Sequence, residues 1–289
     1  MGSRSASRVP DRATALHQLA LTYEAPSALA LDPISVPRSY ASPWDREVTA
    51  WIAAHLAYGR VAPMLNAIGR AVAPLGQEPA QWLRSRTPAQ ARRDLHHALK
   101  GWVWRFHTSS DLVEWVLAWQ RLDRESQRQG LEPHLAPRLD DASLSRFIHR
   151  LRRELPPSAG LRFSLPDPLE GSACKRWRMF LRWMVRPGWP DLGQWKTCCP
   201  ADLVIPVDTH VARVSGLIGL SSRRSPDGRM AAEITAALRE VDPNDPLRFD
   251  FALSHLGIMG HCPGSFQAPL CAPCPLTSLC RVRKAESRP

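Results

Sequence analysis

The sequence has no apolar run close to the roughly 20 residues that a membrane-spanning helix needs. Its first residues, MGSRSASRVPDRAT, contain no hydrophobic segment that could act as a secretory signal. Ala6 also stands where a myristoylation motif requires Ser or Thr. These absences predict a cytoplasmic protein without a membrane partner, and in that reducing compartment we do not expect the seven cysteines to form disulfides.

Internal repeats, low-complexity tracts and convincing strand patterns are also absent, and helical periodicity takes their place. Residues 1–10 are predicted to be a disordered arm, and the proline-containing stretch 27–43 is predicted to be a linker. The segments with a helical pattern are 11–24, 44–59, 62–75, 92–106, 110–122, 143–155, 175–186, 207–220, 228–241 and 246–259. The sequence therefore predicts an all-α protein of about ten helices.

The charge of the chain is strongly basic. The formal net charge is +11 and the pI is near 10.0, while the hydrophobic fraction of 44% is ordinary. This combination favours a folded protein with an anionic partner, and nucleic acid is the first candidate. A solvated basic surface with no specific partner would give the same composition.

Four of the cysteines crowd into the C-terminal stretch HCPGSFQAPLCAPCPLTSLC. Cys262, Cys271, Cys274 and Cys280 have the spacing C-x8-C-x2-C-x5-C, and the prolines and glycine between them suit a loop that folds around a metal centre. A zinc site usually shows two close pairs, whereas only one close pair is present here. The spacing therefore favours a [4Fe-4S] cluster, with zinc as the alternative.

The stretch LEGSACKRWRMF places Lys175 at the start of a predicted helix, directly after a turn of small residues. The positive end of the helix dipole and nearby arginines disfavour a charged ammonium there, and a neutral amine is a nucleophile. The helix should carry an apolar stripe for the core and a basic stripe for DNA. The basic stripe consists of Lys175, Arg178, Arg182 and Arg186, and the apolar stripe of Trp177, Phe180, Leu181 and Met184.

A second segment, IPVDTHVARV, places Asp208 just before another predicted helix, where an aspartate can cap the helix start. These three stretches together resemble the endonuclease III family of DNA glycosylases, in the helix-hairpin-helix superfamily. That family has the cluster loop C-x6-C-x2-C-x5-C, the hairpin L-P-G-V-G-x-K and the segment V-D-T-H-x-x-R-V. The long interval from Lys175 to Asp208 is also similar to that of archaeal 8-oxoguanine glycosylases.

The resemblance implies a two-lobed helix-hairpin-helix glycosylase fold with a C-terminal [4Fe-4S] cluster loop. Residues 1–38 would form an arm and a helix on the cluster lobe, 39–199 a helical barrel with the hairpin, and 200–289 the lobe with the aspartate and the cluster. The chain would be a monomeric DNA repair glycosylase with AP lyase activity, associated with the nucleoid. It would flip an oxidised base, 8-oxoguanine or a pyrimidine, out of damaged double-stranded DNA.

In this interpretation Lys175 attacks C1′ of the sugar and Asp208 assists there. Tyr58 or Arg60 would fill the space left by the flipped base, while Trp104, Arg105 and Phe106 could line its pocket. DNA contacts are expected from Gly171, Ala173, Arg178, Arg182, Tyr58, Arg60 and Arg213. Two other classes of protein remain open: a non-catalytic helix-hairpin-helix DNA-binding protein, and an iron-sulfur redox or sensor protein.

Overall fold

The computed structural model describes residues 11–282, so the predicted arm at 1–10 lies outside the described part of the chain. Nearly all regular structure is helical, which confirms the all-α prediction. The first helices are α1 (Arg12–Tyr23), α2 (Pro26–Leu29), α3 (Ser35–Arg38), α4 (Pro43–Leu56), α5 (Val61–Val72), α6 (Pro79–Arg84) and α7 (Pro88–Ala98). The later helices are α8 (Ser109–Glu125), α9 (Glu132–Leu135), α10 (Asp141–Glu154), α11 (Ala159–Ser164), α12 (Lys175–Val185), α13 (Thr209–Leu217), α14 (Gly228–Arg239), α15 (Asp250–Ile258) and α16 (Ala268–Cys271).

Local signals explain where several helices begin. Ser42 caps α4 by accepting a hydrogen bond from the Trp44 amide at 3.3 Å, and Pro43 occupies the first helical position, as predicted. Helices α7 and α8 each begin with a capping box, in which Thr87 and Thr108 are the respective N-cap residues. These caps satisfy amides that the helices themselves leave without partners.

The stretch predicted to be a linker contains the two short helices α2 and α3, so that prediction was wrong. Helix α3 packs against α4, and Ile34 is fully buried just before it. Prolines in this segment stand at positions that short helices tolerate, such as Pro26 at the start of α2. The prolines therefore limit these helices to about one turn each but do not prevent them from forming.

A small β-hairpin follows α7, where the sequence pattern predicted continuous helix to residue 106. Strand β1 (Val103–Trp104) pairs antiparallel with β2 (His107–Thr108). Gly101 adopts a φ of +74° and Arg105 a φ of +50°, and neither is compatible with a helix. The apolar residues of this segment are spaced as in a helix, but in the structure they belong to a turn and a hairpin.

A cluster of tryptophans forms the centre of the larger core. The indoles of Trp51 and Trp115 stack with centroids 4.2 Å apart, and each N–H donates to the backbone carbonyl of the other residue. Trp177 of α12 meets Trp51 edge-on at 5.6 Å. Trp51 and Trp102 are both buried. Helix α12 is therefore fixed against α4 through aromatic contacts.

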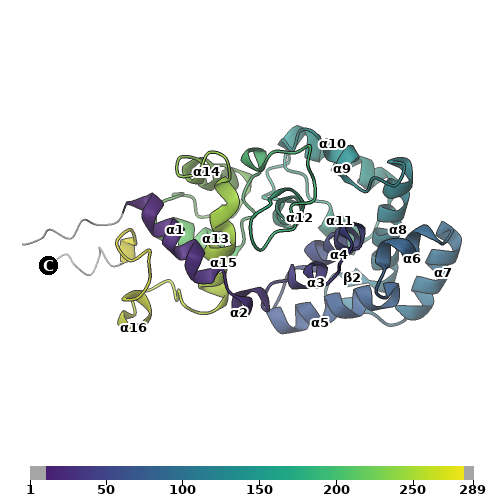
Figure 1. Cartoon of the computed structure of the whole chain (residues 1–289), viewed down its shortest axis with the longest axis horizontal. Helices are drawn as coiled ribbons and strands as arrows, with labels where there is room; N and C mark the ends of the chain where they lie inside the picture. The colour runs from purple at the N-terminus through teal and green to yellow at the C-terminus, as the bar shows by residue number, and fades with distance from the viewer. Residues whose placement is uncertain (1–10, 283–289) are drawn as a thin grey trace, which may run out of the picture.

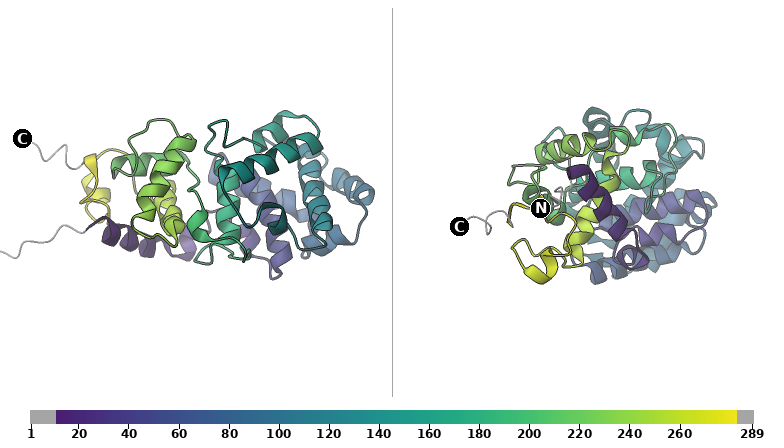
Figure 2. Two further views of the ribbon diagram at one scale, coloured as in Figure 1. Left: turned by 90° about the horizontal axis from the view of Figure 1, so that it is seen from above. Right: turned by 60° about the vertical axis from the view of Figure 1, so that its left-hand side comes forward.

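The helices gather at two ends of an elongated molecule (Figure 1). The N-terminal helix α1 packs against α15, which also contacts α13, so segments far apart in sequence lie together at one end. Helices α6, α7 and α8 lie at the other end, and α12 packs against α4 between the two groups (Figure 1). Figure 2 shows the same elongated arrangement from two further sides. Within residues 11–282, no helix has the length and apolar character needed to cross a membrane.

Candidate functional site

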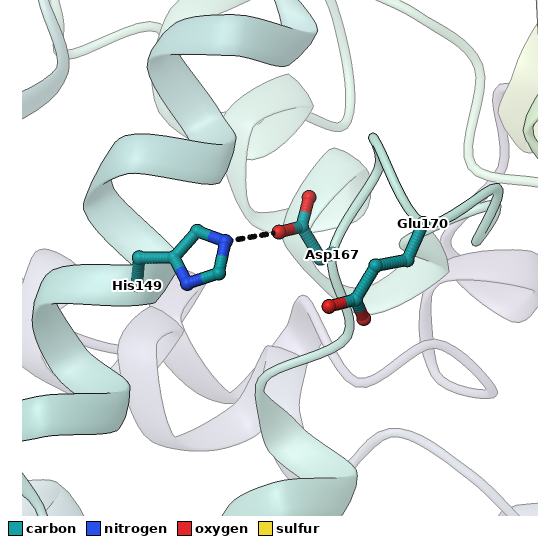
Figure 3. A group of neighbouring side chains, drawn as sticks. All are labelled: His149, Asp167 and Glu170. Carbon is teal, nitrogen blue, oxygen red and sulfur yellow. Dashed lines mark ion pairs between the residues drawn. The ribbon is translucent and has the colours of Figure 1, made fainter.

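The turn before α12 is built around the buried carboxylate of Asp167. Its Oδ1 accepts a hydrogen bond from the Leu169 amide at 2.8 Å, and its Oδ2 accepts one from the Ser145 hydroxyl at 2.9 Å. His149 Nε2 lies 2.7 Å from the same Oδ2 (Figure 3). The chain leading into α12 is therefore held in one conformation by side chains of α10.

Gly171 is exposed at this turn and has a φ of +86°, in the region that favours glycine. Ala173, which stands where the related motif has its second glycine, does not adopt a positive φ; the next residue, Cys174, does, at +48°. Cys174 is the N-cap of α12 and its side chain makes no capping hydrogen bond. The first amides of α12 are thus without a side-chain cap, as a phosphate site at a helix start requires.

Lys175 is the first residue of α12 and is half-buried. Its Nζ donates a hydrogen bond to the Ala57 carbonyl at 3.2 Å. Among residues 11–282 no carboxylate forms an ion pair with it. Lys175 lines a cavity of about 910 Å³, which we call the central cavity, at the junction of the α4–α5 turn with α11, α12, α13 and α15.

Asp208 lines the same central cavity from the start of α13. Its Oδ1 accepts hydrogen bonds from the amides of His210 and Val211, both at 2.8 Å, so the predicted capping role is confirmed. Both bonds use one oxygen, and Oδ2 makes no hydrogen bond with the described part of the chain. The structure therefore brings Lys175 and Asp208 to one cavity, each at a helix start.

The predicted basic stripe on α12 is wrong beyond Lys175. Arg178, Arg182 and Arg186 are only 4%, 3% and 6% exposed, respectively. Because the opposite face of α12 is also buried, the helix has no solvated side. Arg178 and Arg182 therefore do not form a basic surface on α12, and Arg182 reaches only the wall of the central cavity.

Each of the three arginines is neutralised by aspartates that lie outside α12. Arg178 pairs with Asp141 at 3.1 Å. Arg182 pairs with Asp191 at 3.1 Å and also with Asp250. Arg186 pairs with Asp191 and Asp245, both at 2.9 Å. Ion pairing compensates for removing these charges from water, and an exposed position is not required.

Arg213 does not face the central cavity. Its Nη2 donates to the Cys262 carbonyl at 2.8 Å, so it braces the start of the cysteine loop. Its predicted contact with a DNA phosphate is not supported by this placement. His210, by contrast, does line the central cavity.

Tyr58 and Arg60, the residues predicted to fill the space left by the flipped base, differ in how firmly they are held. The Tyr58 hydroxyl lies 2.6 Å from His107 Nδ1 and donates to the Trp104 carbonyl at 3.0 Å, so Tyr58 is anchored and cannot leave its place readily. Arg60 is exposed at the start of α5. Trp104, Arg105 and Phe106 do not line the central cavity, so the prediction that they form its wall was wrong.

The four cysteines of the C-terminal loop line a second, smaller cavity of about 40 Å³. Burial raises the pKa of Cys274 above the usual range, and the neighbouring thiolates of Cys262, Cys271 and Cys280 raise it further. The four thiols thus converge from separate parts of one loop. Cys174 and Cys198 are buried elsewhere and Cys199 is exposed, as expected for residues outside a metal centre.

The spacing of these thiols bears on which metal they could hold. In the described part of the chain, only His149, Asp167 and Glu170 bring three metal-ligating atoms within 4.8 Å of one another. A tetrahedral zinc with Zn–S bonds of ~2.3 Å would need thiols about 3.8 Å apart. No three of the four cysteine thiols meet this condition in the described part of the chain, so the loop is not arranged as a preformed tetrahedral zinc site.

The group of His149, Asp167 and Glu170 is not a convincing cation site (Figure 3). Arg152 already pairs with both carboxylate oxygens of Glu170, at 3.0 and 3.1 Å. A guanidinium at that position would repel a bound cation.

Sequence reasoning missed Asp250 and Arg176, which both line the central cavity. Asp250 is 2% exposed, and its Oδ1 has no hydrogen-bond partner among the described residues. Burial and the nearby Asp208 raise the pKa of Asp250 to about 7, although Arg182 acts in the opposite direction. Arg176 is buried and forms no ion pair with any residue in 11–282. A charged residue inside the apolar run FDFAL was the sequence signal for Asp250.

Comparison with known proteins yields one match. A family model described as "Protein of unknown function (DUF2400)" matches residues 32–259, and neither the curated proteins nor the solved structures contain a match. The matched region includes Lys175 and Asp208 and ends just before Cys262. Since it spans most of the 289 residues, the chain belongs to the DUF2400 family.

Proposed function

We propose that this protein is a bifunctional DNA glycosylase and AP lyase of base excision repair. It excises an oxidised base from double-stranded DNA as a monomer. The observation that carries the proposal is the pair of Lys175 and Asp208 in one cavity, where the lysine has no carboxylate partner among the described residues. A cation held for structural reasons is normally neutralised, as the buried Arg178 and Arg182 of the same helix are. Arg176, which is also buried in this helix, donates to the backbone carbonyls of His55 and Phe163 instead.

The arrangement of helices supports the finer fold proposal, a two-lobed helix-hairpin-helix glycosylase. The glycine turn at Gly171 leads directly into α12, and the central cavity lies where the two groups of helices meet (Figure 1). A flipped base must enter a pocket beside the nucleophile, and a cavity of about 910 Å³ can hold a nucleotide.

The chemistry follows from the positions of the two side chains. Lys175 Nζ is held by one backbone carbonyl, so it can turn toward a sugar at the cost of a single hydrogen bond. The neutral amine attacks C1′, the bond from C1′ to the base breaks, and the base leaves with a proton. The aminal at C1′ then opens by breaking the C1′–O4′ bond, with a proton transferred to O4′, and an iminium remains between C1′ and Lys175. The iminium acidifies the C2′ hydrogen, and loss of that proton expels the 3′ phosphate by β-elimination.

Asp208 supports this sequence from the opposite wall of the cavity. Its Oδ1 is fixed by two amides of α13, which leaves Oδ2 to face positive charge that develops at C1′. The same oxygen can accept a proton from the attacking amine. Both functions need an ionised carboxylate.

We further propose that Cys262, Cys271, Cys274 and Cys280 hold a [4Fe-4S] cluster, with zinc as the alternative. The cavity that all four thiols line, together with the C-x8-C-x2-C-x5-C spacing in the sequence, supports this proposal. When bound, the cluster would supply the cross-link that closes a loop with little helix of its own. Purified protein should show a broad visible absorption that Cys271→Ser removes and Cys199→Ser retains; colourless protein with stoichiometric zinc would contradict the cluster.

The test of the proposed activity is covalent trapping on DNA with an abasic site in the presence of borohydride. Reduction of the imine should give a protein–DNA adduct with the wild-type chain and none with Lys175→Gln. Lys196→Gln is the matched control, because Lys196 is exposed and donates only to the Gly193 carbonyl. A DNA-binding protein without catalysis, or a redox sensor, would give no adduct with any of the three chains.

A further inference from the structure

Exposed apolar side chains gather beside the β-hairpin. Val103 and Phe106 of the hairpin are 59% and 52% exposed, and Phe163 of the adjacent α11 is 37% exposed. The rings of Phe106 and Phe163 lie 4.8 Å apart. Aromatic side chains of this size are usually buried, so their exposure at one place indicates a binding surface.

This surface continues into the central cavity. Tyr58 and Phe163 line the cavity and their rings lie 4.9 Å apart, whereas Phe106 stands outside it. We call Tyr58, Phe106 and Phe163 the aromatic rim. The aromatic rim therefore connects the tip of the hairpin with the cavity that contains Lys175.

The hairpin is rigidly supported from below. The buried ring of His107 contacts the Tyr58 hydroxyl at 2.6 Å and the Ser164 hydroxyl at 2.7 Å. Arg105 at the tip adopts a φ of +50°, a conformation that costs about 1 kcal/mol or more for a residue other than glycine. Because His107 anchors the hairpin and Arg105 constrains its tip, Phe106 is presented in one orientation.

The charges next to the rings suit an anionic aromatic ligand. The guanidinium of Arg176 lies 3.8 Å from the centroid of Phe163, and that of Arg105 lies 6.0 Å from the centroid of Phe106. Arg176 is buried at the cavity and has no ion-pair partner in residues 11–282. Aromatic rings interleaved with arginines are typical of surfaces that stack unpaired nucleobases.

We propose that the aromatic rim stacks an unpaired nucleobase of bound DNA, with Phe106 entering the space that the damaged base vacates in the duplex. The proposal deepens the proposed function and rests on it for DNA as the ligand. Phe106 takes the place of Tyr58 as the residue that fills this space, because the Tyr58 hydroxyl is hydrogen-bonded to the hairpin. An apolar protein partner would not be favoured next to two guanidiniums and a net charge of +11.

The test compares binding to two labelled duplexes by fluorescence anisotropy. One is fully paired, and the other contains a central tetrahydrofuran residue, which leaves the opposite base unpaired and cannot form an imine. Wild type should prefer the second duplex, and Phe106→Ala should reduce that preference by about 5- to 150-fold, as expected for the loss of one stacked base. Phe106→Trp should retain it. Leu21→Ala, which removes an exposed side chain from α1 at the far end of the molecule, is the control.

The outcomes separate this inference from the proposed function. If wild type gives the borohydride adduct but Phe106→Ala keeps the full preference for the unpaired base, the inference is wrong and the activity stands. If no adduct forms but Phe106→Ala still loses the preference, the rim binds nucleobases and the lyase assignment is wrong. An equal loss of affinity for both duplexes would also overturn the inference, because Phe106 would then contact the DNA backbone.

Discussion

Lys175 and Arg182 lie two turns apart on α12, and the protein treats their positive charges in opposite ways. Arg182 is 3% exposed and is enclosed by two aspartates. Lys175 contacts only a backbone carbonyl and faces a large cavity. The first arrangement neutralises a charge for the sake of the core, and the second leaves an amine available for chemistry.

The difference comes from what lies opposite each residue. The aspartates that pair with the arginines of α12 come from α10, from the loop after α12 and from the start of α15. At the first turn of α12, where the cavity begins, no carboxylate in residues 11–282 pairs with Lys175, although Asp208 lines the same cavity. Both residues are basic and lie on one side of the helix, so only the fold distinguishes a structural cation from a reactive one.

The largest expected effect is on stability and concerns Arg182, the buried member of this pair. Arg182→Met should lower the free energy of unfolding by about 3–5 kcal/mol, because it leaves Asp191 and Asp250 buried without their shared cation. Urea denaturation measures this change. Arg93→Met, at an exposed position on α7, should change stability by no more than about 0.5 kcal/mol. Similar values for the two variants would remove the contrast on which the assignment of Lys175 depends.

A second prediction concerns the hairpin at the cavity. Burial lowers the pKa of His107 to about 4, so the folded protein holds a neutral ring where an unfolded chain would take up a proton near pH 6.5. The stabilisation is complete above pH 6.5 and is lost as the pH falls from 6.5 toward 4, by on the order of 2–3 kcal/mol. Urea titrations at pH 7.5 and 5 should show a smaller pH dependence for His107→Gln than for wild type. If the free energy of unfolding changes equally between the two pH values for His107→Gln and wild type, the His107 ring is not buried as a neutral group.

The smallest expected effect on stability is at Asp208. Asp208→Asn keeps the oxygen that caps α13, so stability should fall by no more than about 1 kcal/mol. Base removal should slow by about 100-fold or more, because the amide cannot balance positive charge at the sugar. Excision kinetics on lesion duplexes and urea denaturation of the same sample separate the two roles. Loss of the fold would show that Asp208 serves only as a cap.

The sequence was sufficient for the helical class and for many helix starts, because these depend on local signals. Ser42 and Pro43 marked the start of α4, and Asp208 marked the start of α13. The β-hairpin was missed because its apolar residues follow the helical period until Gly101 and Arg105 turn the chain. Such turns depend on single residues with positive φ, and only the glycine is visible in advance.

The candidate site was partly predictable. Lys175 and Asp208 were found because each stands in a short motif at a helix start. Arg178 and Arg182 were misassigned, because their aspartate partners lie outside α12, from nine to 68 residues away, and cannot be seen in the spacing of the helix. Tyr58 and Phe106 of the aromatic rim were named from the sequence in other roles, but Phe163 and the contacts among the three rings were missed, because the rim joins residues from three separate segments.

The most direct test of the account is to map the borohydride-trapped adduct by protease digestion and mass spectrometry. The chain has only four lysines, Lys100, Lys175, Lys196 and Lys284, so the modified peptide identifies the nucleophile without ambiguity. The account predicts that the reduced sugar is attached to Lys175 alone. An adduct on another lysine or on the N-terminal amine, or no adduct on abasic DNA, would contradict it.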